Sequence, residues 1–233
     1  MLALKSKMEQ NYQCKFCETK FHKESTLATH MCVKKRRHME IDTPGSRFGF
    51  RAFQRFYDLT MKTKKLKSTD DFINSQYYIE FVRFGHHLAN LKPLHPDKFI
   101  DFLLMNQVKL KDWTKDDIYY IYIEDMVKQE PAVSATERSI TEIMNWCERE
   151  GVPFNDFFNK VTANEASHMI KTGKISPWVL YLAGSGANLE SKFNEDHGKI
   201  IGGVIDPGFW MKKFKKADED VEYIRTLLEQ AGL

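Results

Sequence analysis

The sequence is poor in the residues that mark several protein classes. Four cysteines among 233 residues are too few for a disulfide-rich scaffold. Twelve glycines and seven prolines exclude a collagen-like or low-complexity chain. The longest apolar runs, such as residues 178–183, fall far short of the roughly 20 residues that a membrane helix needs. The first residues lack a signal-peptide pattern, so we expect an intracellular protein without a membrane partner.

The composition is that of a globular protein with an uneven distribution of charge. Hydrophobic residues make up 42% of the chain and aromatic residues 13%, which is ample material for a core. Residues 1–67 contain 16 basic and six acidic residues, so they carry +10, and the net charge of +3 leaves 3 − 10 = −7 for residues 68–233. A basic N-terminal third predicts an anionic partner, with nucleic acid as the first candidate. The alternative is an ordinary solvated surface of mixed charge.

Three of the four cysteines lie close together, at Cys14, Cys17 and Cys32. In an intracellular chain such clustering indicates a metal site rather than disulfides. A Cys-x2-Cys pair places two thiolates on one side of a tetrahedral zinc ion. A Cys-x2-Cys redox pair is the alternative, but the strand-and-helix context of a thioredoxin-like protein is missing around it.

The segment around these cysteines resembles the zinc finger of the two-Cys, two-His type. Six positions carry the resemblance: Tyr12, Cys14, Cys17, Phe21, Leu27 and His30. The resemblance implies a small ββα unit whose helix brings His30 to the zinc. Tyr12, Phe21 and Leu27 would form a core too small to fold without the metal, so that binding zinc and folding are one event.

The fourth ligand departs from that family. The family has a second His separated from the first by three to five residues, but here residues 34–36 are Lys-Lys-Arg. His38 would lie about 12 Å further along an unbroken helix, too far to share one metal ion with His30. Cys32 can reach the metal only if the helix unwinds just after His30. We therefore predict the ligands Cys14, Cys17, His30 and Cys32, with His38, His22 or water as alternatives at the fourth position.

Two groups of residues could contact nucleic acid. The resemblance implies that base edges face Lys23, Ser25, Thr26 and Thr29. The run that follows the finger places four positive charges where phosphates could be bound: Lys34, Lys35, Arg36 and Arg37. One finger buries too little surface for tight, specific binding. We expect weakly specific binding, with DNA favoured over RNA; docking of the finger on a partner protein is the alternative.

The remainder of the chain indicates an all-helical body. A turn at Pro44-Gly45 predicts three segments, namely a zinc finger over 10–33, a basic linker over 34–45 and a helical domain over 46–233. The fold class is therefore mainly α, a small ββα-type finger followed by an all-helical globular domain. Apolar spacing and capping residues predict helices over 47–66, from Ser68 or Thr69 to Leu88, from Pro96, from Thr114, from Ser134 to Gly151, from Thr162 to Gly173, from Pro177, from Pro207 and up to Ala231.

No group of residues in the sequence indicates a catalytic site. The adjacent His86 and His87 point about 100° apart on a helix and do not form a metal-binding pair. Gly184-Ser-Gly186 lacks the lysine of a phosphate-binding loop and is interpreted as a helix-ending turn. Cys147 lies on an apolar helix face and is interpreted as a core residue. We therefore expect no enzymatic activity.

The whole chain also resembles a group of proteins from large tailed phages similar to the T-even phages. The resemblance rests on the His30-Met-Cys32 ending, the basic run and the motifs Phe81-Val-Arg-Phe-Gly85, Gly173-Lys-Ile-Ser-Pro-Trp178 and Asp206-Pro-Gly-Phe-Trp210. It supports Cys32 as a ligand and implies a location in the cytoplasm of the host cell. The order of helices is similar to that of the loader of the phage replicative helicase. Our leading hypothesis is a zinc-binding nucleic-acid-binding accessory protein of phage replication or transcription; the alternative is an adaptor that docks a partner, including a helicase-loader-like role.

Overall fold

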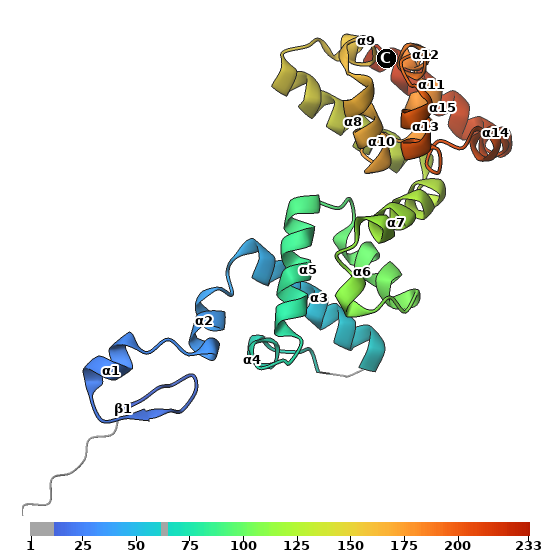
Figure 1. Cartoon of the computed structure of the whole chain (residues 1–233). Coiled ribbons are helices and arrows are strands. Elements are labelled where there is room, and N and C mark those ends of the chain that lie inside the picture. Colours follow the sequence, from blue (N-terminus) through green and yellow to red (C-terminus); the bar gives the residue numbers. More distant parts are fainter. Residues whose placement is uncertain (1–11, 62–64) are drawn as a thin grey trace, which may run out of the picture. The chain divides into compact units, whose positions relative to one another are not determined.

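The computed structural model describes residues 12–61 and 65–233 and is mainly α-helical, as the sequence predicts (Figure 1). It divides into two compact units, residues 1–114 and 115–233. The predicted helical domain over 46–233 spans both units, and the predicted linker over 34–45 contains a helix. Independent folding of the three predicted segments stays a prediction. In the described part of the chain, no helix is both long and apolar enough to cross a membrane.

The first unit begins with a two-stranded hairpin and continues with helices. Its elements are β1 (Tyr12–Gln13), β2 (Lys20–Phe21), α1 (Glu24–Thr29), α2 (Val33–Met39), α3 (Pro44–Met61), α4 (Thr69–Ile73), α5 (Tyr78–Leu91), α6 (Pro96–Met105) and a short 3-10 turn, η1 (Leu110–Asp112). A cluster of aromatic side chains fills its core between α3, α4, α5 and η1: Phe53, Phe72, Phe81, Phe84 and Trp113.

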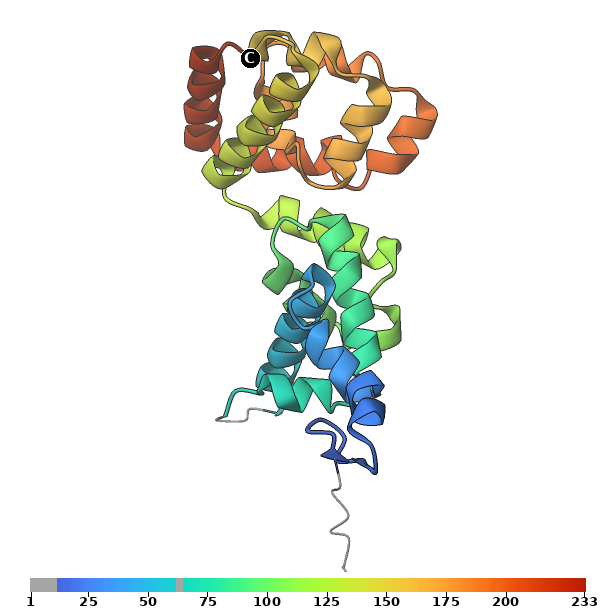
Figure 2. The ribbon, with the colours of Figure 1, turned by 90° about the vertical axis from the view of Figure 1, so that its left-hand side faces the viewer.

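Helices α3 and α5 pack closely because glycines line their contact (Figures 1 and 2). A Cβ atom built on Gly85 of α5 would lie 1.9 Å from the carbonyl oxygen of Gly45 and 2.5 Å from the amide nitrogen of Gly49. Both neighbours are backbone atoms of α3, which cannot move aside as a flexible side chain would. The separation of the two helices therefore depends on the missing side chain at Gly85.

We expect Gly85→Ala to lower the free energy of unfolding by at least about 2 kcal/mol, because overpacking forces backbone shifts. Gly198→Ala is the matched control, since no heavy atom lies within 4 Å of its added Cβ atom. That substitution should stabilise its helix by up to about 1 kcal/mol through helix propensity. Urea denaturation followed by circular dichroism measures both. Equal stabilities of the two variants would contradict the close contact.

The second predicted helix is in fact two helices, because polar side chains interrupt it. Ser68 caps α4 as expected, in a reciprocal capping box with Asp71. The helix then ends at Asn74, whose side-chain amide donates to the carbonyl oxygen of Asp70 at 2.8 Å. Ser75 accepts a hydrogen bond from the amide of Tyr77 through its hydroxyl oxygen at 3.1 Å. These side chains compete for backbone groups that a continuous helix would use.

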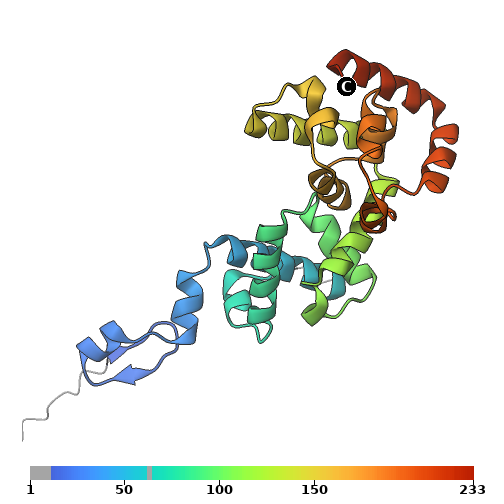
Figure 3. The ribbon, with the colours of Figure 1, turned by 45° about the horizontal axis from the view of Figure 1, so that its top comes forward.

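The second unit consists of helices and a 3-10 turn. They are α7 (Asp116–Gln129), α8 (Ala132–Glu150), η2 (Phe154–Asp156), α9 (Phe157–Lys160), α10 (Ala163–Lys171), α11 (Pro177–Leu182), α12 (Gly186–Glu190), α13 (Glu195–Ile201), α14 (Pro207–Lys216) and α15 (Asp218–Ala231). The buried α11 packs against α8, α12 and α15. In Figure 3, α8 is olive, α11 and α12 are orange, and α15 is red. Arg138 of α8 bonds the buried carboxylate of Glu130 and the carbonyl oxygen of Gly173.

Candidate metal centre

The structure brings the four predicted ligands together. One side-chain ligand atom from each of Cys14, Cys17, His30 and Cys32 lies within 4.8 Å of all the others. Sγ of Cys17 and Nε2 of His30 are 3.3 Å apart. Zinc–sulfur bonds of about 2.3 Å at tetrahedral angles would separate two sulfurs by about 3.8 Å. The cluster is therefore compatible with one metal ion bound by three sulfurs and one imidazole nitrogen.

The hairpin positions the first two ligands. Strand β1 pairs antiparallel with β2, with Tyr12 opposite Phe21. The loop between them is closed by two backbone hydrogen bonds, from the Cys14 amide to the Thr19 carbonyl at 3.0 Å and from the Glu18 amide to the Cys14 carbonyl at 2.8 Å. Glu18 has a positive φ of 61°, which lets the chain turn sharply after Cys17. The tight loop brings the thiols of Cys14 and Cys17 within 4.8 Å of each other.

The short helix α1 explains how Cys32 reaches the cluster. The helix ends at Thr29, and His30 has an extended backbone with φ −66° and ψ 124°. The chain thus leaves the helix at His30. This is necessary because Cys32 follows His30 by only two residues and would point away from the metal on a continuous helix. Cys32 then caps the N-terminus of α2, where its Sγ accepts a hydrogen bond from the Lys35 amide at 3.3 Å.

The alternatives for the fourth position lie outside the cluster. His38 is in α2, where its ring contacts the ring of Phe16 at a centroid distance of 4.9 Å. Its Nε2 also lies 3.8 Å from a carboxylate oxygen of Asp70. His22 is exposed and is not part of the group of ligand atoms. Among the described residues, Cys32 is therefore the fourth member of the cluster.

The surroundings shift the pKa values of Cys17 and Cys32 in opposite directions. The Thr19 hydroxyl, then the Thr19 amide and the His30 ring, lower the pKa of Cys17 to about 6. Burial raises the pKa of Cys32, and the nearby thiols of Cys17 and Cys14 add to that rise. A divalent ion would offset this repulsion, since three thiolates and one such ion sum to 2 − 3 = −1. The remaining negative charge would lie at the N-terminus of α2, where the helix dipole favours it.

The apolar core around the cluster is small. Among residues 12–33, only Cys14 is buried. Tyr12, Phe21 and Leu27 are half-buried, and the Phe21 ring lies 4.8 Å from the ring of His30. A segment with so little buried apolar surface cannot offset the entropy of ordering its backbone by packing alone. We therefore expect the finger to depend on bonds to a metal for its order.

The basic run forms most of α2, and its four side chains differ in their surroundings. Lys34 and Arg36 are exposed. Nζ of Lys35 donates to the His30 carbonyl at 3.1 Å. Arg37 is engaged instead: its guanidinium donates to the Ile73 carbonyl at 2.5 Å and lies 4.2 Å from the centre of the Tyr78 ring. Arg37 thus attaches α2 to α4 and α5, a role that sequence reasoning missed.

The predicted base-facing residues lie on or next to α1. Lys23 is its N-cap residue, and the others are in the helix: Ser25, Thr26 and Thr29. All four are exposed, so they remain available to a ligand. The hydroxyl of Thr29 already donates to the carbonyl oxygen of Ser25 at 3.1 Å.

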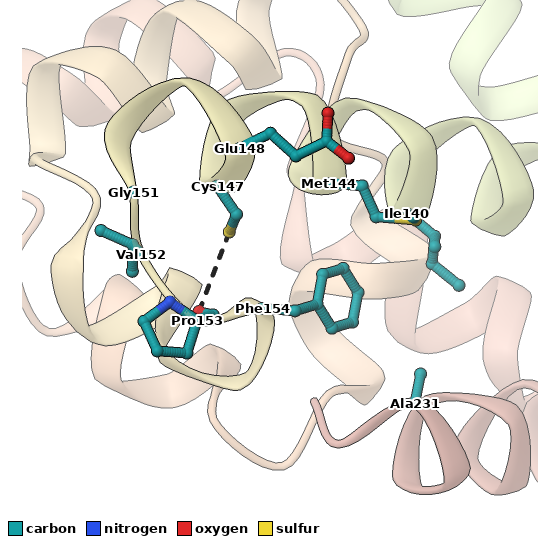
Figure 4. A pocket seen from close by; sticks show the side chains of 9 residues that line it. All are labelled: Ile140, Met144, Cys147, Glu148, Gly151, Val152, Pro153, Phe154 and Ala231. Carbon is teal, nitrogen blue, oxygen red and sulfur yellow. Dashed lines mark hydrogen bonds between the residues drawn. The ribbon is translucent and has the colours of Figure 1, made fainter.

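A cavity of about 640 Å³ lies in the second unit, away from the metal ligands in sequence (Figure 4). Its walls are mostly apolar, and Cys147 and Glu148 add a thiol and a carboxylate to them. The Cys147 thiol is buried and donates to the Pro153 carbonyl at 3.9 Å. Burial raises the pKa of Cys147, which disfavours the thiolate that a nucleophile needs. The interpretation of Cys147 as a core residue agrees with this geometry.

The structure also shows the surroundings of His86 and of Gly184-Ser-Gly186, two features that the sequence analysis interpreted as non-catalytic. The His86 ring lies against Gly45, where a Cβ atom would come within 2.4 Å of the imidazole. Gly184-Ser-Gly186 connects α11 to α12, as expected for a turn that ends a helix. A Cβ atom on Gly186 would lie 2.0 Å from the Leu180 carbonyl, so a close backbone contact explains that glycine.

Comparison of the chain with protein-family models, with curated proteins and with solved structures finds no match. The zinc-finger interpretation therefore rests on the six positions in the sequence and on the geometry of the cluster. The resemblance to phage proteins and to the helicase loader stays a prediction.

Proposed function

We propose that this chain is a zinc-stabilised, non-enzymatic protein that binds nucleic acid through its N-terminal finger and helix α2. The observation that carries the proposal is the place of the Cys3His cluster, which caps the same helix that carries the basic run. Binding of the metal would therefore order the surface that presents the cations.

Zinc is the metal that best fits this set of ligands. Tetrahedral sites of thiolates and imidazole are typical of structural zinc, whereas magnesium and calcium prefer oxygen ligands. All four positions are filled by protein side chains, which is the arrangement of a structural rather than a catalytic zinc site. The proposed role of the ion is thus to hold the finger and the start of α2 in place.

The charge of the finger and α2 supports an anionic ligand. Residues 12–39 contain seven basic and two acidic residues, which gives 7 − 2 = +5 with neutral histidines. The exposed cations of this segment are Lys15, Lys20, Lys23, Lys34 and Arg36, whereas Arg37 is held by the body of the first unit. We propose DNA over RNA, weak sequence preference, and a role beside a replication or transcription protein, as in a phage.

Removing exposed cations of α2 should flatten the salt dependence of binding. Each phosphate contact contributes about 0.7–0.9 to the slope of log K against log salt concentration. Lys34→Ala and Arg36→Ala should therefore each reduce the slope by about that amount. Fluorescence anisotropy with labelled oligonucleotides at several salt concentrations measures it. Lys23→Ala should instead change sequence preference.

The controls separate charge from structure. Lys199→Ala removes an exposed cation of the second unit and should leave the slope unchanged. Arg37→Ala should lower thermal stability, because it removes the bond to Ile73 and the contact with Tyr78. If the unaltered chain binds no oligonucleotide even at low salt, the nucleic-acid proposal fails.

A protein-docking finger is the second candidate function. Three apolar side chains around α2 are exposed: Met31, Val33 and Met39, with exposed fractions of 47%, 62% and 66%. Such side chains suit an apolar contact with a partner protein. Docking of this kind would be nearly independent of salt, whereas binding through phosphates falls steeply as salt rises.

A further inference from the structure

We propose that the nucleic acid bound by the finger is single-stranded, and that one unstacked base enters a cavity formed by the hairpin loop, α1 and α2. This inference rests on the proposed function and names the form of its ligand. Three observations support it: the lining of the cavity, the shortness of α1 and the placement of two lysines.

The cavity has the chemistry of a base-binding site. Its volume is about 270 Å³, and two residues of the metal cluster, Cys14 and His30, form part of its lining. Phe16 and Leu27 supply apolar walls, and Lys15 and Lys35 supply cations. Single-strand-binding sites combine such an aromatic surface for the base with cations for the adjoining phosphates.

Helix α1 is poorly suited to reading a duplex. It has six residues, which at 1.5 Å per residue is a length of about 9 Å. The major groove is about 12 Å wide and 8.5 Å deep, so the helix is shorter than the groove is wide. The side chains within the helix that could face bases are the short hydroxyls of Ser25, Thr26 and Thr29. The Thr29 hydroxyl already donates a hydrogen bond to the Ser25 carbonyl. Bidentate contacts to base edges need longer groups such as Arg, Lys, Asn or Gln, and Lys23 is the only such group among the four base-facing positions.

The aromatic wall is accessible and flanked by cations. One side of the half-buried Phe16 ring contacts His38, at a centroid distance of 4.9 Å. Nζ of the exposed Lys15 lies 5.0 Å from the centre of the same ring. An incoming base can replace Lys15 at the ring, and the freed ammonium group can then pair with the adjoining phosphate. Lys35, held at the His30 carbonyl, provides a second cation at the cavity.

Phe16→Leu tests the inference in the full, zinc-loaded chain, since leucine keeps an apolar contact with His38 but removes the aromatic face. The probes are a labelled single-stranded oligonucleotide and a labelled hairpin duplex, titrated at one salt concentration. We expect the unaltered chain to bind the single strand at least about 10-fold more tightly than the duplex. Phe16→Leu should weaken single-strand binding about 5- to 150-fold, the range for one stacked base, and leave duplex binding unchanged.

Two further variants make the result specific. Phe16→Tyr retains an aromatic face and should bind the single strand like the unaltered chain. Tyr77→Leu removes an exposed aromatic side chain elsewhere in the first unit and should have no effect. The visible spectrum of the cobalt-substituted protein shows whether each Phe16 variant keeps the metal site.

Each other outcome has a distinct meaning. Equal affinity for both probes, or equal losses for both in Phe16→Leu, would overturn the single-strand inference and leave the proposed function standing. If Phe16→Leu loses the cobalt spectrum of the metal site, the result for Phe16→Tyr decides. Weak single-strand binding by Phe16→Tyr with an intact spectrum would overturn the inference. If the unaltered chain binds neither the single strand nor the duplex, the proposed function itself is overturned.

Discussion

A chain carrying Cys32→Ala should bind zinc about 100- to 1,000-fold more weakly than the unaltered chain. Structural zinc sites in finger peptides bind with about 10–16 kcal/mol, so one ligand of four accounts for roughly 2.5–4 kcal/mol. The structure makes Cys32 the fourth member of the cluster, with its Sγ at the N-terminus of α2. Competition against a chromophoric zinc chelator measures the loss.

Two variants serve as controls for this experiment. His38→Ala should bind zinc as tightly as the unaltered chain, because His38 contacts Phe16 and Asp70 rather than the cluster. Cys147→Ala removes a thiol that is buried in the second unit and should also leave zinc binding unchanged. Loss of affinity in His38→Ala equal to that in Cys32→Ala would show that the ligand set is wrong.

Much of the metal centre could be predicted from the sequence because its geometry is local. Cys14 and Cys17 follow from their spacing, and the resemblance to the zinc finger implies His30. The assignment of Cys32 needed one physical step, since a residue two positions after His30 points away on a continuous helix. The observed end of α1 at Thr29 is the consequence that this step requires.

The part played by Arg37 could not be predicted, because its partners are distant in sequence. Ile73 and Tyr78 lie about 40 residues further along the chain, and no local pattern pairs them with one cation among four. The same limit applies to the division between Thr114 and Lys115. Capping residues such as Thr162 and Gly151 predict where helices begin and end, but packing partners decide which helices form one unit.

Removal of the metal should unfold residues 12–32 while α3 and α5 stay folded. Hydrogen exchange measured by mass spectrometry, with and without a strong chelator, tests this in the full chain. The finger should lose its protection because its half-buried core cannot hold the hairpin and α1 without bonds to the metal. Helices α3 and α5 should keep their protection, because the contact of Gly85 with Gly45 and the aromatic core do not involve the cluster.

Helix α2 lies between these two parts and should respond in an intermediate way. Without the metal, the first turn of α2 loses the anchored thiolate of Cys32 that caps it. Its last turn keeps Arg37 on the Ile73 carbonyl and the Tyr78 ring. We therefore expect exchange to rise at the start of α2 and to change little near Arg37. Loss of protection throughout α3 and α5 would show instead that the finger is an integral part of the first unit, and that the metal stabilises far more than the finger and the first turn of α2.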